Sequence, residues 1–264
     1  GHGTAPSGLV SFKVEDMQAA VRVAMRDLRE QMGPDRPIYM VGYSNGAALA
    51  VDYALSALAG ADLPRPAGLV LLSPAIGIAK VAVVARMRTG LSSLPGFGRA
   101  AWQQIVQEFD PYKYSSFSFN AAGQTQRLTS GLASRVERLA RSRPIEGFPP
   151  VLAFQSTVDS TVRAEAVVDA LLEHLAPGNH ELVLFDVNRL AGAQALLVRD
   201  PGPLTARLLA MPARTFALTV ITNATIETDR MKELRAEPGS SRQTSRALEL
   251  TWPRDVFSLT HVAL

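Results

Sequence analysis

The stretch between residues 37 and 60 most constrains what this chain can fold into. Residues 37–41 are apolar on both faces of an extended strand, which is typical of a central strand in a parallel sheet. The apolar run stops at Gly42, and a helix rich in small residues is predicted over residues 46–59, closed by Gly60. A buried strand that turns into a helix within a few residues indicates a sheet covered by helices.

Further strand and helix patterns continue this alternation. Apolar residues at three- and four-residue steps predict an amphipathic helix over residues 14–32, which ends before Gly33-Pro34. The alternation predicts an α/β fold, with a mostly parallel sheet of the α/β-hydrolase type and helices on both faces. Buried strands are predicted at residues 68–73, 150–155, 181–185 and 215–222, and a helix near residues 163–175.

The stretch between residues 74 and 149 has a different character. It has helical patches at about 100–108 and 120–141 and no convincing buried strand. Seven of the seventeen aromatic residues fall between Phe97 and Phe119. We interpret this stretch as a helical insertion on the sheet, with a helical packing layer as the alternative. Later in the chain, the polar residues 237–245 predict a mobile loop.

Composition excludes several classes of function. With 47% hydrophobic and 19% charged residues, the chain can bury a core, which argues against disorder. The absence of cysteine excludes disulfides, thiolate metal sites and a cysteine nucleophile. The 23 arginines and 4 lysines fit a GC-rich bacterial genome and are spread at helical spacing, so we predict solvated helix faces and no nucleic-acid partner. No apolar run is long enough for a membrane span.

Residues 42–46 form a G-x-S-x-G sequence between the predicted strand and the predicted helix. A tight strand-to-helix turn forces the middle serine, Ser44, into strained backbone angles and pushes its hydroxyl out above the sheet. Gly42 and Gly46 are expected to leave room for the strand and the helix to approach. The helix N-terminus would present the N–H of Asn45 to a developing oxyanion. We predict that Ser44 is a nucleophile, the alternative being a serine that only caps the helix.

A serine nucleophile needs a base, and the chain has four histidines. His174 is predicted on a solvent-facing helix, His180 in a polar turn, and His2 at the start of the chain. His261 follows the last strand-like segment. If the three residues occur along the chain in the order serine, acid, histidine, then the histidine must lie near the end of the chain. This order favours His261.

Two aspartates are candidates for the acid that orients the imidazole of the base. Asp159 falls just past the carboxyl end of the strand at 150–155, on the edge where catalytic residues of parallel sheets gather. Asp186 follows the strand at 181–185 and is its rival. We favour Asp159, and the alternative role for it is to cap the next helix.

These residues resemble the α/β-hydrolase family, in particular its esterase, monoacylglycerol-lipase and serine-aminopeptidase types. The resemblance implies a hydrolase core at residues 1–75 and 150–264, a lid over an acyl pocket at residues 76–149, and an inserted segment at about 187–247. It implies neither a metal nor an organic cofactor. The matching pieces span the whole chain: Gly1-His2-Gly3-Thr4 with Ser7-Gly8, residues 42–46, residues 155–159, and His261-Val262.

The chain departs from the family pattern in two ways. The family places four strands and a loop that donates a second oxyanion N–H before the G-H-G loop, and a closing helix after the histidine. Because none of these is found here, we expect an internal segment of a longer protein, with the strand at 37–41 left as an exposed hydrophobic edge. The second departure is the interval of roughly 75 residues before His261, which predicts an inserted subdomain.

The resemblance implies a serine hydrolase that cleaves carboxylic esters, such as acylglycerols or lysophospholipids, through an acyl-enzyme. The expected partner is a small-molecule acyl ester; membrane association, oligomeric state and the choice between cytoplasm and cell envelope stay open. One alternative is a serine aminopeptidase, in which Glu108 or Asp110 would hold the substrate's ammonium group. The other is a catalytically inert hydrolase-like module with an incomplete oxyanion hole.

Overall fold

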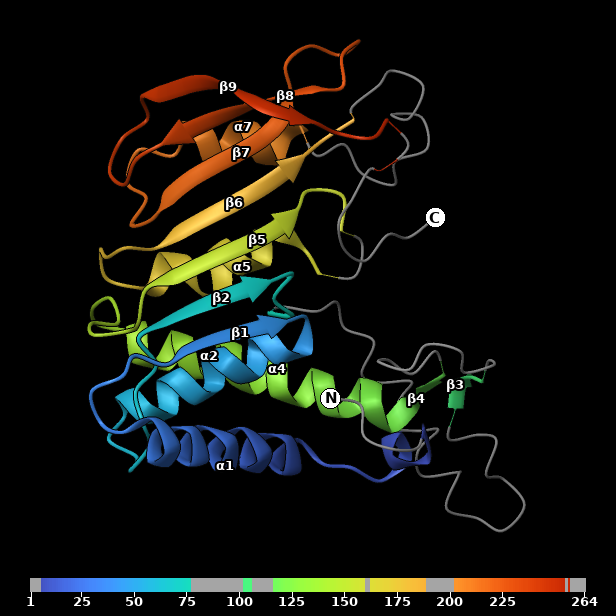
Figure 1. The fold of residues 1–264 in the computed structure, drawn as a ribbon, viewed down its shortest axis with the longest axis vertical. Helices are drawn as coiled ribbons and strands as arrows, with labels where there is room; N and C mark the ends of the chain where they lie inside the picture. Colours follow the sequence, from blue (N-terminus) through green and yellow to red (C-terminus); the bar gives the residue numbers. More distant parts are fainter. Residues whose placement is uncertain are drawn as a thin grey trace.

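A seven-stranded sheet in the order β1-β2-β5-β6-β7-β8-β9 forms the centre of the molecule (Figure 1). The computed structural model describes residues 6–76, 102–105, 116–159, 162–188, 202–254 and 256. The first five strands pair in parallel, and the last two add antiparallel pairs. The chain therefore has the mostly parallel α/β sheet that was predicted. The strands are β1 (Tyr39–Tyr43), β2 (Gly68–Leu72), β5 (Val151–Ser156), β6 (Glu181–Asp186), β7 (Ala217–Asn223), β8 (Arg230–Ala236) and β9 (Gln243–Thr251).

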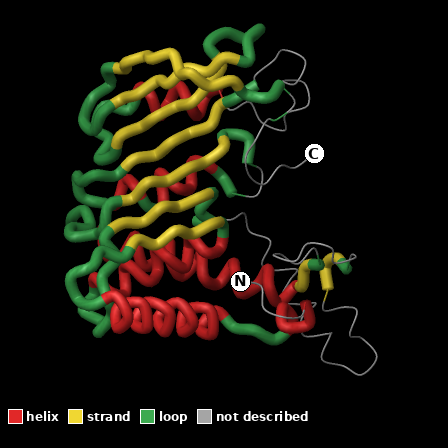
Figure 2. Tube along the Cα trace, viewed as in Figure 1, coloured by secondary structure: helices red, strands yellow, loops and turns green. Residues whose placement is uncertain are grey.

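The helices of the described residues pack on one face of this sheet (Figure 2). Alternate strand residues such as Leu71 and Leu184 are fully buried in one core with side chains of α2, α4, α5 and α7. α1 packs beside α2 and α4. Of the two helical layers that were predicted, the described residues form one. The helices are α1 (Val14–Met32), α2 (Asn45–Leu58), α4 (Phe119–Ala140), α5 (Ala164–Ala170) and α7 (Gly202–Ala210), with 3-10 turns η1 (Pro6–Val10) and η3 (Leu172–His174).

α4 lies inside the stretch that was predicted as a lid. Its residues Leu128, Leu132 and Val136 recur at four-residue steps and are almost completely buried in the same core as α2. This part of the stretch packs against α2, α1 and α5.

The helical patch predicted at about 100–108 is wrong for its described residues. Trp102–Gln104 form a strand, β3, which pairs antiparallel with β4 (Phe117–Ser118). The pairing partner lies more than ten residues further along the chain, so local periodicity does not reveal it.

The last two strands were missed because they lack apolar runs. Residues 237–245, predicted as a mobile loop, contain the turn between β8 and β9, and residues 243–245 already belong to β9. Both strands have many half-buried or exposed residues, so few apolar residues are needed to form them. Within the predicted insertion at 187–247, the structure places α7, β7 and β8, and the two strands extend the main sheet.

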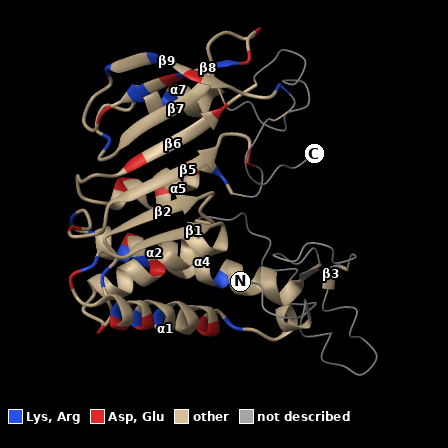
Figure 3. Ribbon diagram, viewed as in Figure 1, with Lys and Arg blue, Asp and Glu red and all other residues tan. Residues whose placement is uncertain are grey.

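The two edges of the sheet differ in character. β1 forms one edge and exposes Tyr39, Val41 and Tyr43 by 64%, 69% and 52%. The central position indicated by residues 37–41 is therefore wrong in this chain, and the exposed hydrophobic edge is confirmed. β9, at the other edge, carries charged residues such as Arg246 and Glu249 (Figure 3). Charged residues protect an edge from pairing with other chains, and β1 has none.

Candidate active site

Ser44 lies between the end of β1 and the start of α2. Its backbone has φ 51° and ψ −115°, a conformation that is costly for a residue other than glycine. Its N–H donates to the carbonyl of Leu72 at 2.9 Å, and its own carbonyl accepts from the N–H groups of Ala47 and Ala75, each at 3.1 Å. These bonds hold the turn, and the strained serine predicted from residues 42–46 is confirmed.

Gly42 allows the strand and the helix to come this close. A Cβ at Gly42 would lie 2.5 Å from the Cα of Ala47 and 2.6 Å from the carbonyl oxygen of Gly46. A Cβ at Gly46, in contrast, would have no atom of the described residues within 4 Å. The expectation that both glycines make room is therefore confirmed for Gly42, whereas at Gly46 no described residue comes close enough to need the space.

The hydroxyl of Ser44 makes no capping hydrogen bond to α2, although Ser44 is the N-cap residue, and the residue is half-buried. The alternative role as a helix cap is therefore not seen. The N–H of Asn45 is the first of α2 and has no acceptor within the helix, and the helix dipole adds positive potential there. The side chain of Asn45 turns toward α1, where its amide donates to the sulfur of Met17 at 3.4 Å. Asn45 therefore offers its backbone N–H, and not its side-chain amide, beside Ser44.

The carboxyl ends of the parallel strands bring the predicted nucleophile and both candidate acids to one edge of the sheet (Figure 1). Ser44 follows β1, Asp159 comes three residues after β5, and Asp186 ends β6. Since neighbouring strands lie about 4.8 Å apart, Asp159 is roughly 10 Å from the strand of Ser44 and Asp186 roughly 14 Å. A histidine ring with a hydrogen bond on each nitrogen spans about 7–8 Å. The spacing of the strands favours Asp159 over Asp186.

Asp159 is buried and its carboxylate is oriented by neighbouring groups. The N–H of Val162 donates to its Oδ1 at 2.9 Å, and the amide of Gln155 donates to its Oδ2 at 3.2 Å. Burial and, second, the negative charge of Asp159 raise the pKa of Tyr43. Because Tyr43 directly precedes Ser44, this interaction indicates that Asp159 lies close to the nucleophile turn. The N-cap residue of α5 is Arg163, so capping that helix is not the role of Asp159.

The carboxylate of Asp186, at the end of β6, accepts hydrogen bonds from a residue of α7 and from the residue that follows β5. The hydroxyl of Thr205, on α7, donates to its Oδ2 at 2.9 Å, and that of Thr157 donates to its Oδ1 at 3.3 Å. The bond from Thr205 ties α7 to the end of β6.

Two of the four histidines lie near the amino ends of the parallel strands, opposite the carboxyl ends that carry Ser44 and Asp159. His180 directly precedes β6, and its carbonyl accepts from the N–H of Ala217 at the start of β7. His174 ends η3, and its carbonyl accepts from the N–H of Ile145. A six-residue strand is about 20 Å long, so neither imidazole reaches the carboxyl edge. The structure leaves as candidate bases His2 and His261, which lie outside the described residues, as do Glu108, Asp110 and residues 1–4.

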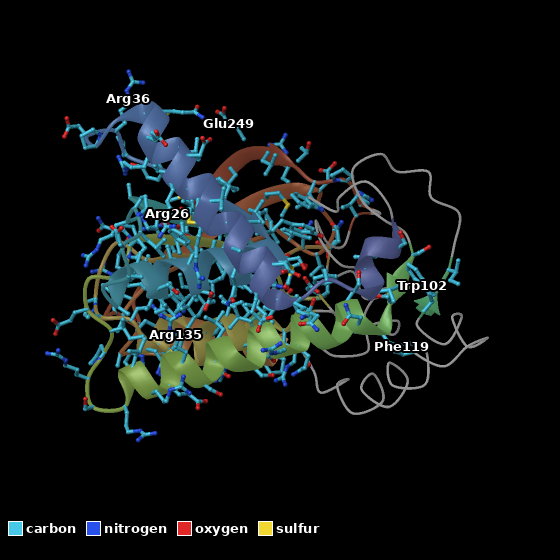
Figure 4. The ribbon with its side chains drawn as sticks, turned by 90° about the horizontal axis from the view of Figure 1, so that it is seen from below. Arg26, Arg36, Trp102, Phe119, Arg135 and Glu249 are labelled. Atoms are coloured by element: carbon cyan, nitrogen blue, oxygen red, sulfur yellow. The ribbon has the colours of Figure 1, made fainter. Side chains whose placement is uncertain are left out.

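A groove of about 410 Å³ lies elsewhere, on the helical layer, and is lined by Arg22 and Arg26 of α1, Arg135 of α4 and Ser56 of α2. Figure 4 labels Arg26 and Arg135. Ser56 is twelve residues along α2 from Ser44, a distance of about 18 Å.

In the part of the chain that the structure describes, no three His, Asp or Glu side chains could hold a metal ion. No helix of that part combines the length and the apolarity that crossing a membrane requires.

Asn188 was not predicted, although it lies at the same edge, two residues after β6. It has φ 55° and is 3% exposed, and its amide donates to the carbonyls of Pro253 and Val256, each at 2.7 Å. An asparagine just after a buried strand is a signal for a left-handed turn, because asparagine adopts positive φ more readily than most residues.

No protein-family model and no curated protein matches this chain. Among solved structures, it is similar to a proposed hydrolase from Agrobacterium vitis S4, at 16% identity and a TM-score of 0.46, over 66% of this chain and 60% of that one. It is also similar to a lipase-esterase related protein from Clostridium acetobutylicum ATCC 824, at 16% identity and a TM-score of 0.39, over 78% and 76% of the two chains. The chain thus spans less than two thirds of the Agrobacterium protein. Both TM-scores are below 0.5, so the function is inferred from the residues of this chain.

Proposed function

We propose that this protein is a serine hydrolase that cleaves carboxylic esters through an acyl-enzyme. The observation that carries the proposal is the conformation of Ser44 at the turn between a parallel strand and a helix. Such strain persists only where the surroundings impose it, and here Gly42 and the backbone bonds of the turn do so. A strained, half-buried serine that does not cap its helix, at the carboxyl edge of the sheet, is typical of a nucleophile.

In the proposed reaction, the hydroxyl of Ser44 attacks the ester carbonyl carbon while His261 takes its proton. The N–H of Asn45 receives the negative charge that develops on the carbonyl oxygen. His261 then gives the proton to the departing alcohol, which leaves the acyl group on Ser44. Water, deprotonated by the same histidine, attacks the acyl carbon. The bond to the Oγ of Ser44 then breaks, the histidine returns the proton to that oxygen, and the carboxylic acid is released. The carboxylate of Asp159 accepts a hydrogen bond from the other ring N–H of His261 and stabilises the imidazolium.

The course of the chain supports His261 as the base. β8 and β9 are an antiparallel pair, so β9 runs parallel to β7 and ends at the carboxyl edge. Asn188 holds the chain there as far as Val256. Five residues lead from Val256 to His261, and an extended chain covers up to about 17 Å in five residues. Asp159 follows β5, which neighbours β6 at about 5 Å, so His261 has enough chain to reach it.

The test compares Ser44→Ala with Ser73→Ala. Ser73 follows β2, also has positive φ, and has a buried hydroxyl without a hydrogen-bond partner, so it is a matched serine outside the proposed mechanism. We expect Ser44→Ala to lower turnover of p-nitrophenyl esters by at least about 10⁴-fold and Ser73→Ala to leave it nearly unchanged. Full turnover in Ser44→Ala would contradict the mechanism.

A fluorophosphonate probe separates the proposal from its alternatives. Labelling of Ser44 requires a working base, so the unmodified protein should be labelled and Ser44→Ala should not. A folded protein that is not labelled would indicate the inert module. Turnover of aminoacyl-p-nitroanilides in place of esters would indicate the aminopeptidase.

A further inference from the structure

The side chain of Asn188 joins three segments that are far apart in the sequence. Its backbone N–H donates to the Oδ1 of Asn223, at the end of β7, at 2.6 Å, and its Oδ1 accepts from the amide of Asn223 at 3.3 Å. Its own amide donates to the carbonyls of Pro253 and Val256. An asparagine amide has two donor hydrogens, and both are used on the segment that follows β9. Burial of Asn188 strengthens these bonds, because the local dielectric constant is low.

The segment that Asn188 holds is itself a packed turn. The N–H of Val256 donates to the carbonyl of Pro253 at 3.1 Å, and the indole N–H of Trp252 donates to the carbonyl of Val256 at 2.7 Å. The ring of Trp252 lies 5.7 Å from that of Phe185 on β6, which lies 6.4 Å from that of Phe154 on β5. The aromatic contacts place the turn over β5 and β6, and Asn188 ties it to the carboxyl edge.

We propose that Asn188 is a positioning residue, which fixes the point at which the chain leaves the sheet toward His261. This inference rests on the proposed function. His261 is separated from Asp186 by 75 residues, and the bonds of Asn188 are what returns the chain to the end of β6. With the turn fixed, four residues separate Val256 from the proposed base His261; with the turn released, the base would be displaced from Ser44 and Asp159. A displacement of about 1 Å can lower a rate by about 100-fold.

The chemistry of position 188 selects the test variant. Asn188→Asp has the same shape and tolerates positive φ, but its carboxylate cannot donate to the carbonyls of Pro253 and Val256. Asn223→Asp is the matched control, since it makes the same substitution at the same edge. It leaves the acceptor for the N–H of Asn188 in place. It removes the donor to the Oδ1 of Asn188 and to the carbonyl of Thr228, and neither of these bonds involves the turn at residues 253–256.

The experiment measures kcat and KM for a p-nitrophenyl ester, with and without added imidazole, at a temperature where circular dichroism shows each variant folded. We expect kcat of Asn188→Asp to fall about 10- to 100-fold with KM nearly unchanged, and imidazole to restore part of the rate, as in His261→Ala. Asn223→Asp should have a lower Tm, nearly unchanged kcat and no imidazole rescue.

Three outcomes would overturn the inference. Unchanged kcat in Asn188→Asp would show that the bonds to the turn are not needed. An equal loss in Asn223→Asp, without rescue, would indicate a purely structural role. Full activity in His261→Ala would overturn the proposed function itself, which is a different result from a His261-dependent enzyme that tolerates Asn188→Asp.

Discussion

Replacing Gly42 by alanine tests the close approach of strand and helix on which the nucleophile turn depends. The added Cβ would meet the Cα of Ala47 at 2.5 Å, its nitrogen at 2.6 Å, and the carbonyl oxygen of Gly46 at 2.6 Å. Nonbonded carbon atoms prefer about 3.5–4.0 Å, so the overlap is about 1 Å. All three contacts are backbone atoms, which cannot rotate away. β1 and α2 must separate, although α2 buries much of its length in the core and Met40 of β1 packs against that core.

Overpacking of this kind usually costs about 1–3 kcal/mol, and a rigid backbone contact places Gly42→Ala at about 3 kcal/mol or more. The matched control is Gly46→Ala, four residues away in the same turn. Its Cβ would touch no atom of the described residues, and alanine is favoured over glycine in a helix by about 1 kcal/mol. The two variants should therefore differ by about 4 kcal/mol in the free energy of unfolding.

The assay is urea unfolding followed by far-ultraviolet circular dichroism, with thermal melts as a second measurement. At about 2–4 °C per kcal/mol for a chain of this size, Gly42→Ala should lower Tm by about 6–12 °C. Gly46→Ala should leave Tm unchanged or raise it slightly. Equal losses in both variants, or a loss below about 1 kcal/mol in Gly42→Ala, would refute the packing argument.

Two further predictions concern buried polar groups. Ser118→Ala should cost about 1–3 kcal/mol, because its buried hydroxyl donates to Leu9 at 2.6 Å and accepts from Ala121 at 3.0 Å. Ser73→Ala, equally buried but without a hydrogen-bond partner, should cost less than about 0.5 kcal/mol; the reverse order in urea unfolding would contradict this assignment. Burial lowers the pKa of His180 below its usual 6.5, so the unfolded chain binds the proton more readily and stability should fall as pH drops below that value. Urea midpoints at about pH 7.5 and about pH 5.5 should differ less in His180→Gln than in the parent, and equal differences would argue against this origin.

The parallel part of the sheet could be predicted because its strands are runs of apolar residues, whether they are mostly buried, as in β2, or mostly exposed, as in β1. β1, β2, β5, β6 and β7 all coincide with predicted strands, and α2 follows β1 as expected. The outer strands β8 and β9 could not, since residues such as Lys232 and Glu233 are compatible with either a loop or an exposed strand. Position in the sheet, which decides how much apolar surface a strand needs, is a property of the whole fold.

Of the candidate site, the residues that directly follow predicted strands could be predicted, and those that depend on distant contacts could not. Ser44 and Asp159 follow predicted strands, and parallel strands end at a common edge, so their proximity follows from sequence order and topology. The role of Asn188 depends on bonds to residues about 65 positions later, which no local pattern reveals. The absence of described residues within 4 Å of a Cβ at Gly46 likewise depends on what packs against the turn, and not on the turn itself.

The bonds of Asn188 have a consequence for how this part of the chain can change in length. The amide of Asn188 and the carbonyl of Pro253 are 2.7 Å apart, so residues 189–252 leave the carboxyl edge and return to the same point. These residues include the paired strands β7, β8 and β9, so only the connections between elements can change in length without moving a strand. Doubling the length of a flexible connection adds only about 0.6 kcal/mol of closure entropy. A longer turn between β8 and β9, at residues 237–242, would still deliver residue 256 to the same place. The length of that turn is therefore uncoupled from the geometry of the edge that carries Ser44 and Asp159.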